Sequence, residues 1–296
     1  MTTVSSDIVT GAINRSLPSR IIARFGGGVL RIALIVIALL WLLPTFGLLV
    51  ESLRNPGQYA KGGWWQVFVH PAQLTISNYT SLLQNGTITG SLLNTVKITV
   101  PATLLVVLIG AAAGYAFAWL EFPGRDWLFL IVVGLLVIPI QIALIPVVKL
   151  YGSIGIAGTI TSVVIFHVAF GLPFAIFLLR NYFAGIPRDL MEAARIDGAS
   201  EGRIFFRIIL PLGLPAIASL GIFQFLWVWN DLLVALVFSD ASSQPLTVAL
   251  ASQTRQFGSS IDILAPGAFL SLVIPLAVFL GFQRFFVQGV MAGSVK

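Results

Sequence analysis

The sequence PRDLMEAARIDGASEGRIFFRIILP, residues 187–211, differs from the long apolar runs that make up most of the chain. Eight of its 25 positions are charged, and its residues predict two short helices joined by a break. Pro187 suits the first position of a helix, where its missing N–H is not needed. Gly198 indicates where that helix ends, because glycine readily adopts the left-handed conformation that follows many helices. Ser200 can cap the second helix, and Pro211 predicts the start of the next element.

The first of these two helices is expected to be a surface element. Asp189 and Glu192 place negative charge near the positive end of its dipole. With about nine residues it is too short to persist alone in water, so packing must hold it. The neighbouring Ala193 and Ala194 allow another surface to approach it closely.

Composition places the chain among membrane proteins. Of its 296 residues, 57% are hydrophobic and 9% are charged, against roughly 25% charged in a soluble domain. The absence of cysteine excludes disulfides, thiolate metal sites and cysteine nucleophiles. No block of like charges or basic-aromatic stripe favours nucleic acid. The glycine run at residues 26–28 lacks the spacing of a phosphate loop, so nucleotide hydrolysis is not expected.

Six predominantly apolar stretches are each long enough to cross a hydrocarbon core of ~30 Å. The second stretch has small residues from Gly110 to Gly114, which predict close helix packing. We therefore predict an all-α polytopic membrane protein, with a polar leader at residues 1–28 and a six-helix domain at residues 29–296. The predicted spans are residues 32–50, 98–120, 127–148, 159–179, 214–238 and 264–285.

The distribution of basic residues predicts the orientation. Six spans put both termini on the same side of the membrane. With the N-terminus inside, twelve lysines and arginines lie on the cytoplasmic side and five lie outside, as the positive-inside rule requires. Both termini and residues 187–211 are then cytoplasmic, and the polar segments 51–90 and 239–262 are external.

A spaced pattern within residues 187–211 carries a family resemblance. Glu192-Ala193-Ala194, Gly198 four positions after Ala194, and Ile208 with Leu210-Pro211 resemble the EAA signature of permease subunits in binding-protein-dependent ABC importers. In that family the segment is the cytoplasmic coupling helix, which sits in a cleft of the ATPase subunit. The alternative is an ordinary amphipathic connector between two membrane helices. The residues that the resemblance assigns to ATPase coupling are Met191, Glu192, Ala193, Ala194, Arg195 and Gly198.

The resemblance extends from about residue 91 to the C-terminus and implies a type I ABC importer permease fold, with its core at about residues 91–285. Further matching stretches are Ile138-Pro139 and residues 244–250, and the last six residues resemble those of α-glucoside-type relatives. By the same resemblance, residues 239–262 approach a solute-binding protein and residues 289–296 lie near the ATPase pair. No role is assigned to the leader.

The sequence also offers candidates for the substrate path. Asp231 lies within a predicted span, where a charge costs about 2.5–3.5 kcal/mol and therefore faces a cavity or a partner. Trp229-Asn230-Asp231 resembles the fifth helix of MalG-type sugar permeases, and aromatic, amide and carboxylate groups suit a carbohydrate. The alternative is that Asn230 and Asp231 hold helices together or lie near water. The candidates are Gln224, Trp227, Asn230 and Asp231.

Two histidines complete the inventory of titratable groups that catalysis or metal binding would use. His70 and His167 are far apart in the sequence and have no metal-ligand spacing. His167 falls inside the predicted fourth span, where a hydrogen bond within the helix bundle and a proton relay are the two alternatives. No catalytic, cofactor-binding or metal-binding residue is predicted.

These observations predict one permease subunit of an ABC importer for a di- or oligosaccharide, such as the α-glucosides maltose and trehalose, in a bacterial or archaeal cytoplasmic membrane. The implied partners are membrane lipid, a second related permease subunit, an external solute-binding protein and two ATPase subunits, which bind ATP and magnesium. The alternatives are a permease for another solute and an ion-coupled secondary transporter. The latter typically shows inverted repeats and several intramembrane ionisable groups. A membrane enzyme would need a nucleophile paired with a base, and none is evident.

Overall fold

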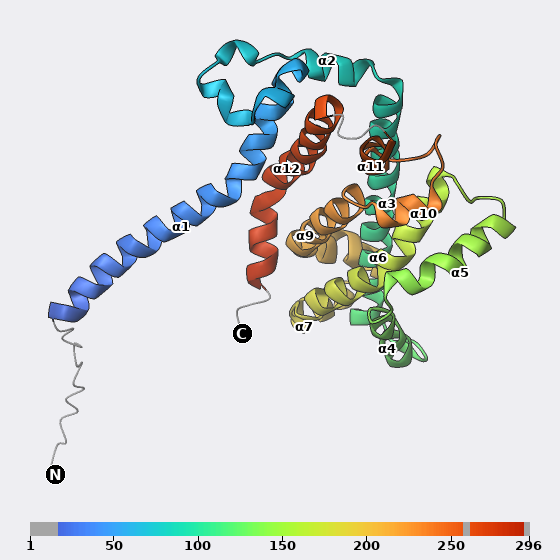
Figure 1. The fold of residues 1–296 in the computed structure, drawn as a ribbon. Helices are drawn as coiled ribbons and strands as arrows, with labels where there is room; N and C mark the ends of the chain where they lie inside the picture. Colours follow the sequence, from blue (N-terminus) through green and yellow to red (C-terminus); the bar gives the residue numbers. More distant parts are fainter. Residues whose placement is uncertain (1–16, 257–260, 293–296) are drawn as a thin grey trace.

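The computed structural model describes residues 17–256 and 261–292, and within these ranges the chain forms helices and no β-strand. This confirms the predicted all-α class. Five long helices, α1, α3, α6, α9 and α12, are joined by shorter ones (Figure 1). Their bounds are α1 Leu17–Ser52, α2 Ser77–Gln84, α3 Gly86–Trp119, α4 Arg125–Leu135, α5 Ile140–Ser153, α6 Ile160–Ala184, α7 Arg188–Ile196, α8 Glu201–Ile204, α9 Leu210–Trp229, α10 Leu233–Phe238, α11 Leu246–Gln256 and α12 Ile261–Ala292.

Five helical segments are long and apolar enough to cross a membrane, and each overlaps a predicted span. They are Gly28–Ser52, Gly86–Trp119, Ile160–Ala184, Glu201–Trp229 and Asp262–Arg284.

The third span, predicted as a single helix at residues 127–148, is instead two helices. Between α4 and α5 the chain bends by 101°. Pro139 lies at this break with extended backbone angles (φ −64°, ψ 132°). Because proline lacks an N–H and disfavours a helical conformation in the residue before it, helix α4 ends and α5 starts anew. The described residues therefore contain six spans only if the bent pair counts as one.

The fifth span also differs from its prediction. A π-turn at Phe205–Ile209 (η4) joins α8 to α9, so the backbone remains helical from α8 past Pro211. The Leu210 N–H bonds the carbonyl of Phe205, five residues back. Helix α9 begins at Leu210, so the predicted start of an element at Pro211 is confirmed to within one residue. The continuity with α8 was not predicted, because the π-turn accommodates the proline without ending the helix. The span then breaks after Trp229, and α10 follows.

Helices α3 and α6 cross closely at the centre of the bundle. A Cβ atom added at Gly110 would lie 2.7 Å from the Cβ of Ala175, and one added at Gly114 would lie 3.0 Å from the Cβ of Leu179. No side chain larger than hydrogen fits there without displacing α6. The small-residue face predicted on the second span is therefore confirmed as a helix contact.

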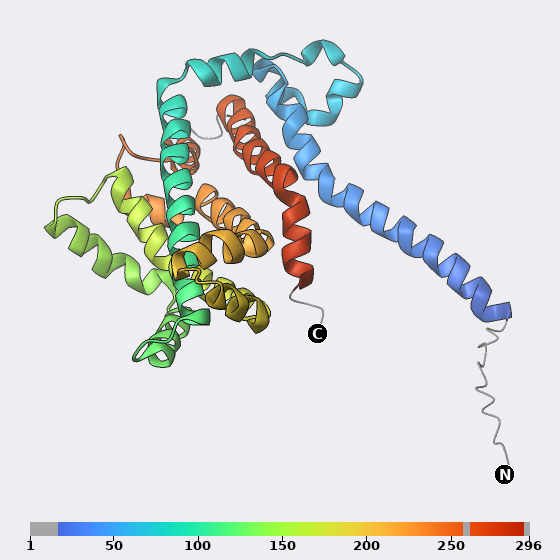
Figure 2. The same cartoon turned by 180° about the vertical axis from the view of Figure 1, so that it is seen from behind.

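Helix α1 extends away from the other helices over most of its length and approaches α12 near its C-terminal end (Figures 1 and 2). Its apolar side chains between Val29 and Leu43 are exposed, Trp41 to 80%. Residues 17–28, predicted as part of a leader, belong to this helix. Residues 1–16, 257–260 and 293–296 lie outside the described part of the chain.

The polar segment after α1 is organised by a buried arginine. Three 3-10 turns, η1 Pro56–Lys61, η2 Trp64–Phe68 and η3 Pro71–Gln73, lie between α1 and α2. The side chain of Arg54 is fully buried and donates to Gln73 Oε1 at 2.9 Å, to the Gly62 carbonyl at 2.9 Å and to the Gln58 carbonyl at 2.8 Å. It also pairs with Glu51 at 3.0 Å. One cation thus joins the end of α1 to the turns that follow.

Candidate functional site

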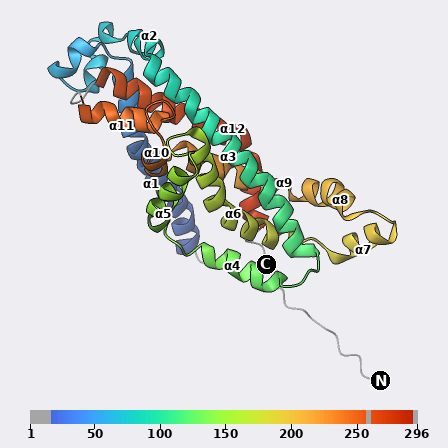
Figure 3. The same ribbon diagram turned by 90° about the vertical axis from the view of Figure 1, so that its right-hand side faces the viewer.

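Helices α7 and α8 protrude from one end of the bundle (Figure 3). Pro187 was predicted as the first residue of the first of these helices. In the structure it directly precedes α7, which begins one position later, at Arg188. Met191 is fully buried in a core that includes Phe183, Ile204 and Ile209. The expectation that packing holds this short helix is therefore confirmed.

The turn between α7 and α8 depends on Gly198. Its φ is +73°, and its N–H donates to the Arg195 carbonyl at 3.0 Å. The next N–H, of Ala199, donates to the Ala194 carbonyl at 3.0 Å. This pair of bonds is a Schellman motif, which ends a helix with a left-handed residue. The predicted helix end at Gly198 is confirmed. The predicted cap of α8 is also confirmed, because the Ser200 side chain accepts from the Arg203 N–H.

A chain of polar contacts fastens the two short helices to α3. The Arg195 Nε–H donates to Glu201 Oε1 at 3.0 Å, and its Nη2 donates to the Trp119 carbonyl at 3.3 Å. The hydroxyl of Tyr115 donates to the other carboxylate oxygen of Glu201. The hydrogen bond to Glu201 raises the pKa of Arg195 above its ordinary value. Arg195 therefore has its partners within this chain.

Sequence reasoning missed Glu201 and Tyr115. Their contact joins positions 86 residues apart. No local spacing announces such a pair, so only the fold reveals it.

The outer face of α7 is exposed. Glu192 and Ala193 are exposed, and Glu192 forms no hydrogen bond or ion pair within the described residues. Two apolar side chains lie beside them in the open, Leu190 at 42% and Ile196 at 87% exposure. Apolar side chains clustered on a polar surface are typical of an interface. Leu190 and Ile196 were missed by sequence reasoning, although their apolar character on a charged helix was a usable signal. We call Leu190, Glu192, Ala193 and Ile196 the docking face.

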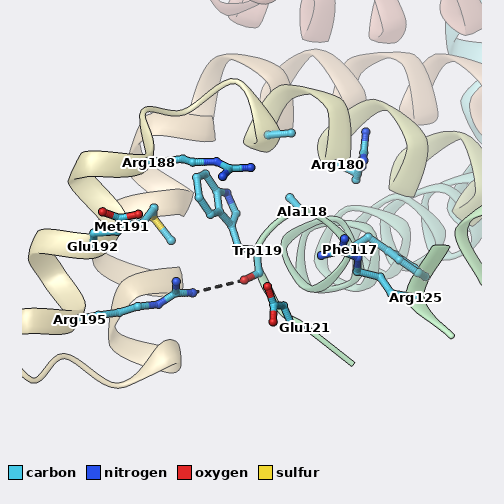
Figure 4. A pocket seen from close by; sticks show the side chains of 11 residues that line it. Phe117, Ala118, Trp119, Glu121, Arg125, Arg180, Arg188, Met191, Glu192 and Arg195 are labelled. Atoms are coloured by element: carbon cyan, nitrogen blue, oxygen red, sulfur yellow. Dashed lines mark hydrogen bonds between the residues drawn. The ribbon is translucent and has the colours of Figure 1, made fainter. Parts of the chain in front are cut away.

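A pocket lies behind this face, between α7 and the ends of α3, α4 and α6 (Figure 4). Its volume is about 390 Å³. Arg188 and Trp119 are among the residues that line it, and Figure 4 shows their side chains. Its charged lining residues are Glu121, Arg125, Arg180, Arg188, Glu192 and Arg195.

Asp231, the first substrate-path candidate, lies just past the end of α9. Its Oδ1 accepts from the Val234 N–H at 3.2 Å and its Oδ2 from the Ala235 N–H at 2.9 Å, so it caps α10. Its carbonyl accepts from the Thr247 hydroxyl at 2.6 Å. Its side chain, 10% exposed, borders an interior gap with no room for a water molecule. These contacts match the alternative in which Asp231 holds helices together.

His167 lies next to Asp231 in the bundle. Its Nε2 is 3.7 Å from Asp231 Oδ2, and its Nδ1 is 2.9 Å from the Val163 carbonyl. Trp227 stands against its ring, with the ring centroids 5.0 Å apart. The structure thus brings three residues that the sequence singled out into one group.

The other two substrate-path candidates are placed differently. Gln224 is buried, and its Nε2 has no hydrogen-bond partner within the described residues. Asn230 is exposed and its side chain donates to the Leu226 carbonyl at 2.8 Å. The two do not form a common site.

The segment after α10 is tied to the start of α3. The Asn94 side chain donates to the carbonyls of Ser242 and Gln244, and the Leu246 N–H donates to the Thr95 hydroxyl. Asp240 accepts from the side chain and backbone of Ser242, and these hydrogen bonds lower its pKa below the ordinary range. This part of the predicted external segment is therefore ordered by contacts with the bundle.

Comparison with known proteins places these features in a family. Residues 106–291 match the family described as "Binding-protein-dependent transport system inner membrane component". This range includes the docking face, the pocket and the group around Asp231.

Curated relatives match over most of the chain. The osmoprotective compounds uptake permease protein GgtD of Synechocystis is 48% identical, over 90% of this chain and 91% of the relative. The α-glucoside transport system permease protein AglG of Rhizobium meliloti is 48% identical, over 76% of this chain and 61% of the relative. The trehalose transport system permease protein SugB of Mycobacterium tuberculosis is 33% identical, over 86% and 92%.

Solved structures show the same fold. A chain of a bacterial ABC transporter involved in the import of the acidic polysaccharide alginate superposes with a TM-score of 0.77, at 22% identity, over 89% of this chain and 97% of that chain.

Proposed function

Because the chain belongs to the binding-protein-dependent transport system inner membrane component family, we propose that it is the permease subunit of an ABC importer that carries a di- or oligosaccharide, such as an α-glucoside, into the cell. It is a multi-pass inner-membrane protein. Relatives named for α-glucoside and trehalose transport, at 48% and 33% identity, support the substrate class. The alternative, a permease for another solute, is favoured by the relative named for osmoprotective compounds.

The observation that carries this proposal is the docking face on α7. A short helix presents an unpaired carboxylate and two exposed apolar side chains, while Met191 anchors its other side in the core. We infer that an ATPase subunit binds this face, with Glu192 opposite a cation of that partner. In this proposal ATP and magnesium bind to the ATPase subunits and not to this chain, which acts as the translocation subunit.

Helix α8 connects this docking event to the interior. The helical segment Glu201–Trp229 is continuous across the π-turn and ends two residues before Asp231. A displacement of α7 would reach α8 through the Arg195–Glu201 contact and then move α9 against α3 and α12, its neighbours in the bundle. Packed helices with two discrete arrangements convert such a shift into alternating access.

Two further partners follow from surfaces left open. The exposed apolar face of α1 requires lipid or a second, related permease subunit, because such a surface is not stable in water. Outside the membrane, the turns around Arg54 and the segment containing Asp240 would face a solute-binding protein. With both termini cytoplasmic, α7 and its pocket lie on the ATP side.

The test is transport by the assembled complex. Glu192→Lys reverses the charge of the docking face, and we expect the ATPase subunits to dissociate or hydrolysis to continue without uptake. Asp126→Lys, at an exposed carboxylate outside α7, is the matched control and should leave coupling intact. Equal coupling in both variants would exclude the docking role. A panel of maltose, trehalose, longer oligosaccharides and glycine betaine, measured by stimulation of ATPase activity, separates the sugar proposal from the alternative.

A further inference from the structure

We propose that the pocket between α3, α4, α6 and α7 binds the phosphate headgroup of an anionic phospholipid. The proposal goes beyond the transport function, since it assigns a ligand to a pocket that lies behind the docking face and shares only Glu192 with it. The pocket is roomy enough for a headgroup, at about 390 Å³. Its charges, its unsatisfied donors and its apolar rim each point to this ligand.

Arginine is the most frequent charged residue in the pocket. Four arginines and two glutamates line it. Arg125 and Arg195 are paired with Asp126 and Glu201, so Arg180 and Arg188 are the two arginines without a carboxylate partner among the described residues. Guanidinium groups bind phosphate oxygens with paired N–H donors, so arginine is the side chain best suited to this anion. The two glutamates set a limit, because they disfavour a ligand that places its charge near Glu121 or Glu192.

Two of the arginines have unused donors. Arg188 forms no hydrogen bond or ion pair within the described residues. The Nε of Arg180 is buried and has no hydrogen-bond partner in the same part of the chain. The Nη1 of Arg180 donates to Asn181 Oδ1 at 3.1 Å, and its guanidinium carbon lies 4.8 Å from the centroid of the Phe129 ring. The donors that a phosphate oxygen can reach directly are those of the exposed Arg188, and hydrogen bonds from a guanidinium to phosphate are among the strong ones.

The position of the pocket matches the headgroup level of a membrane. It lies where α3 ends at Trp119, where α4 begins at Arg125 and where α6 ends at Ala184. Basic pockets between membrane helices on the cytoplasmic side are typical binding sites for anionic headgroups.

An apolar surface adjoins the pocket. A second hollow shares Glu121 and Arg125 with it and extends to Trp127. From there the outer side of α4 is apolar and open, with Trp127 at 73%, Leu130 at 57% and Ile131 at 58% exposure. A ligand with a phosphate and acyl chains would fill the pocket and cover α4 at once. A soluble acidic partner would leave that apolar surface uncovered, so these observations favour lipid.

The experiment uses the assembled transporter purified in neutral detergent, and native mass spectrometry to measure the binding of phosphatidylglycerol and phosphatidylcholine. The test variant carries Arg180→Gln and Arg188→Gln. The control carries Arg203→Gln and Arg207→Gln, two exposed arginines of the same cytoplasmic segment that do not line the pocket. Each lost arginine should weaken phosphatidylglycerol binding about fivefold. The test variant should therefore bind it about 25-fold more weakly, and the control within about twofold of the original.

Further arms make the result decisive. Arg180→Lys with Arg188→Lys keeps the charge and should retain most binding, which separates charge from misfolding. Inorganic phosphate alone, at millimolar concentration, should not displace phosphatidylglycerol, because it lacks the acyl chains.

Three results would overturn the proposal. One is equal binding of phosphatidylglycerol by test and control variants. Another is displacement by inorganic phosphate together with no preference over phosphatidylcholine, which would indicate a plain anion site. The third is loss of the ATPase subunits with lipid binding unchanged, which would assign the pocket to an acidic protein partner. Failure of the coupling role would be seen in a different measurement, the ratio of uptake to ATP hydrolysis, and not in lipid binding.

Discussion

The Nε of Arg195, in the helix that presents the docking face, lies 3.0 Å from Oε1 of Glu201, the first residue of the helix that enters the bundle. This contact, with the hydroxyl of Tyr115 on the other carboxylate oxygen, fixes α7 relative to α8 and α3. Arg195 is part of the coupling motif that the sequence predicts, yet the structure gives it an internal partner. Its contribution is then to hold the docking helix in position.

We expect Glu201→Gln to uncouple transport with little loss of stability. The side chains of Arg195 and Glu201 are 41% and 44% exposed. Their ion pair therefore contributes only about 0.5 kcal/mol to the free energy of folding. The positional effect should be larger, because two short helices lose their charged link. Sugar uptake per ATP hydrolysed should fall, measured in proteoliposomes alongside thermal unfolding. Asp126→Asn, which removes an exposed ion pair outside α7 and α8, is the control; if it reduced coupling as much, the positioning role would be wrong.

Gly198→Ala and Gly202→Ala should change stability in opposite directions. A Cβ atom at either position meets nothing within 4 Å, so crowding does not distinguish them. Gly198 has a φ of +73°, where alanine is less favourable by about 1–2 kcal/mol. Gly202 is helical, where alanine is favoured by about 0.5–1 kcal/mol. Thermal unfolding of the purified complex measures both. Destabilisation by Gly202→Ala equal to that by Gly198→Ala would refute the backbone explanation.

Replacement of Asp231 by alanine should reduce the amount of assembled transporter. The substitution removes the cap of α10, worth about 1 kcal/mol, and leaves two N–H groups without their acceptor. Asp231→Asn keeps one acceptor oxygen and should be milder. Detergent gel filtration gives the assembled fraction, and uptake kinetics give KM. A raised KM with normal assembly would instead place Asp231 in the substrate path.

We expect Arg54→Gln to be among the most destabilising single substitutions outside the bundle core. Arg54 is fully buried, so its loss leaves Glu51 and two carbonyls without their donor. Removal of one partner from a buried ion pair costs about 3–5 kcal/mol. Lys61→Gln, in the same segment but on the surface, should have almost no effect. Limited proteolysis of residues 53–77 is the measurement, and equal protease resistance of the two variants would contradict the expectation.

Much of this fold was predictable because the membrane limits the choices. Long apolar stretches must be helical, and five of the six predicted spans overlap a membrane-length helical segment. The end of α7 just before Gly198 was predictable, because glycine is the residue that most readily adopts the left-handed conformation found after helices. The break at Pro139 and the continuity of the helix past Pro211 were not predictable. Proline lies at a helix break in the first case and is accommodated by a π-turn in the second.

The site was predictable only in part, for a physical reason. The coupling motif is local, so its spacing is visible in the sequence. The partners of Arg195, Asp231 and Arg54 come mostly from other elements or from backbone groups, and the pocket is formed by four helices. Such contacts depend on how helices cross. The substrate-path assignment remains a prediction. The contacts of Asp231 within the chain are enough to explain a carboxylate in the predicted span, and no sugar ligand is needed for this.

The helix from Glu201 to Trp229 has a consequence for how force travels. Its 29 residues, at 1.5 Å each, extend over about 43 Å, more than the thickness of a hydrocarbon core. A push delivered at its first turn would be carried along a single helical segment, in which the π-turn at Phe205–Ile209 and Pro215 are the points where bending is expected. In the proposed mechanism, movement at the near end would therefore also displace the far end, which would link opening on one side of the membrane to closing on the other.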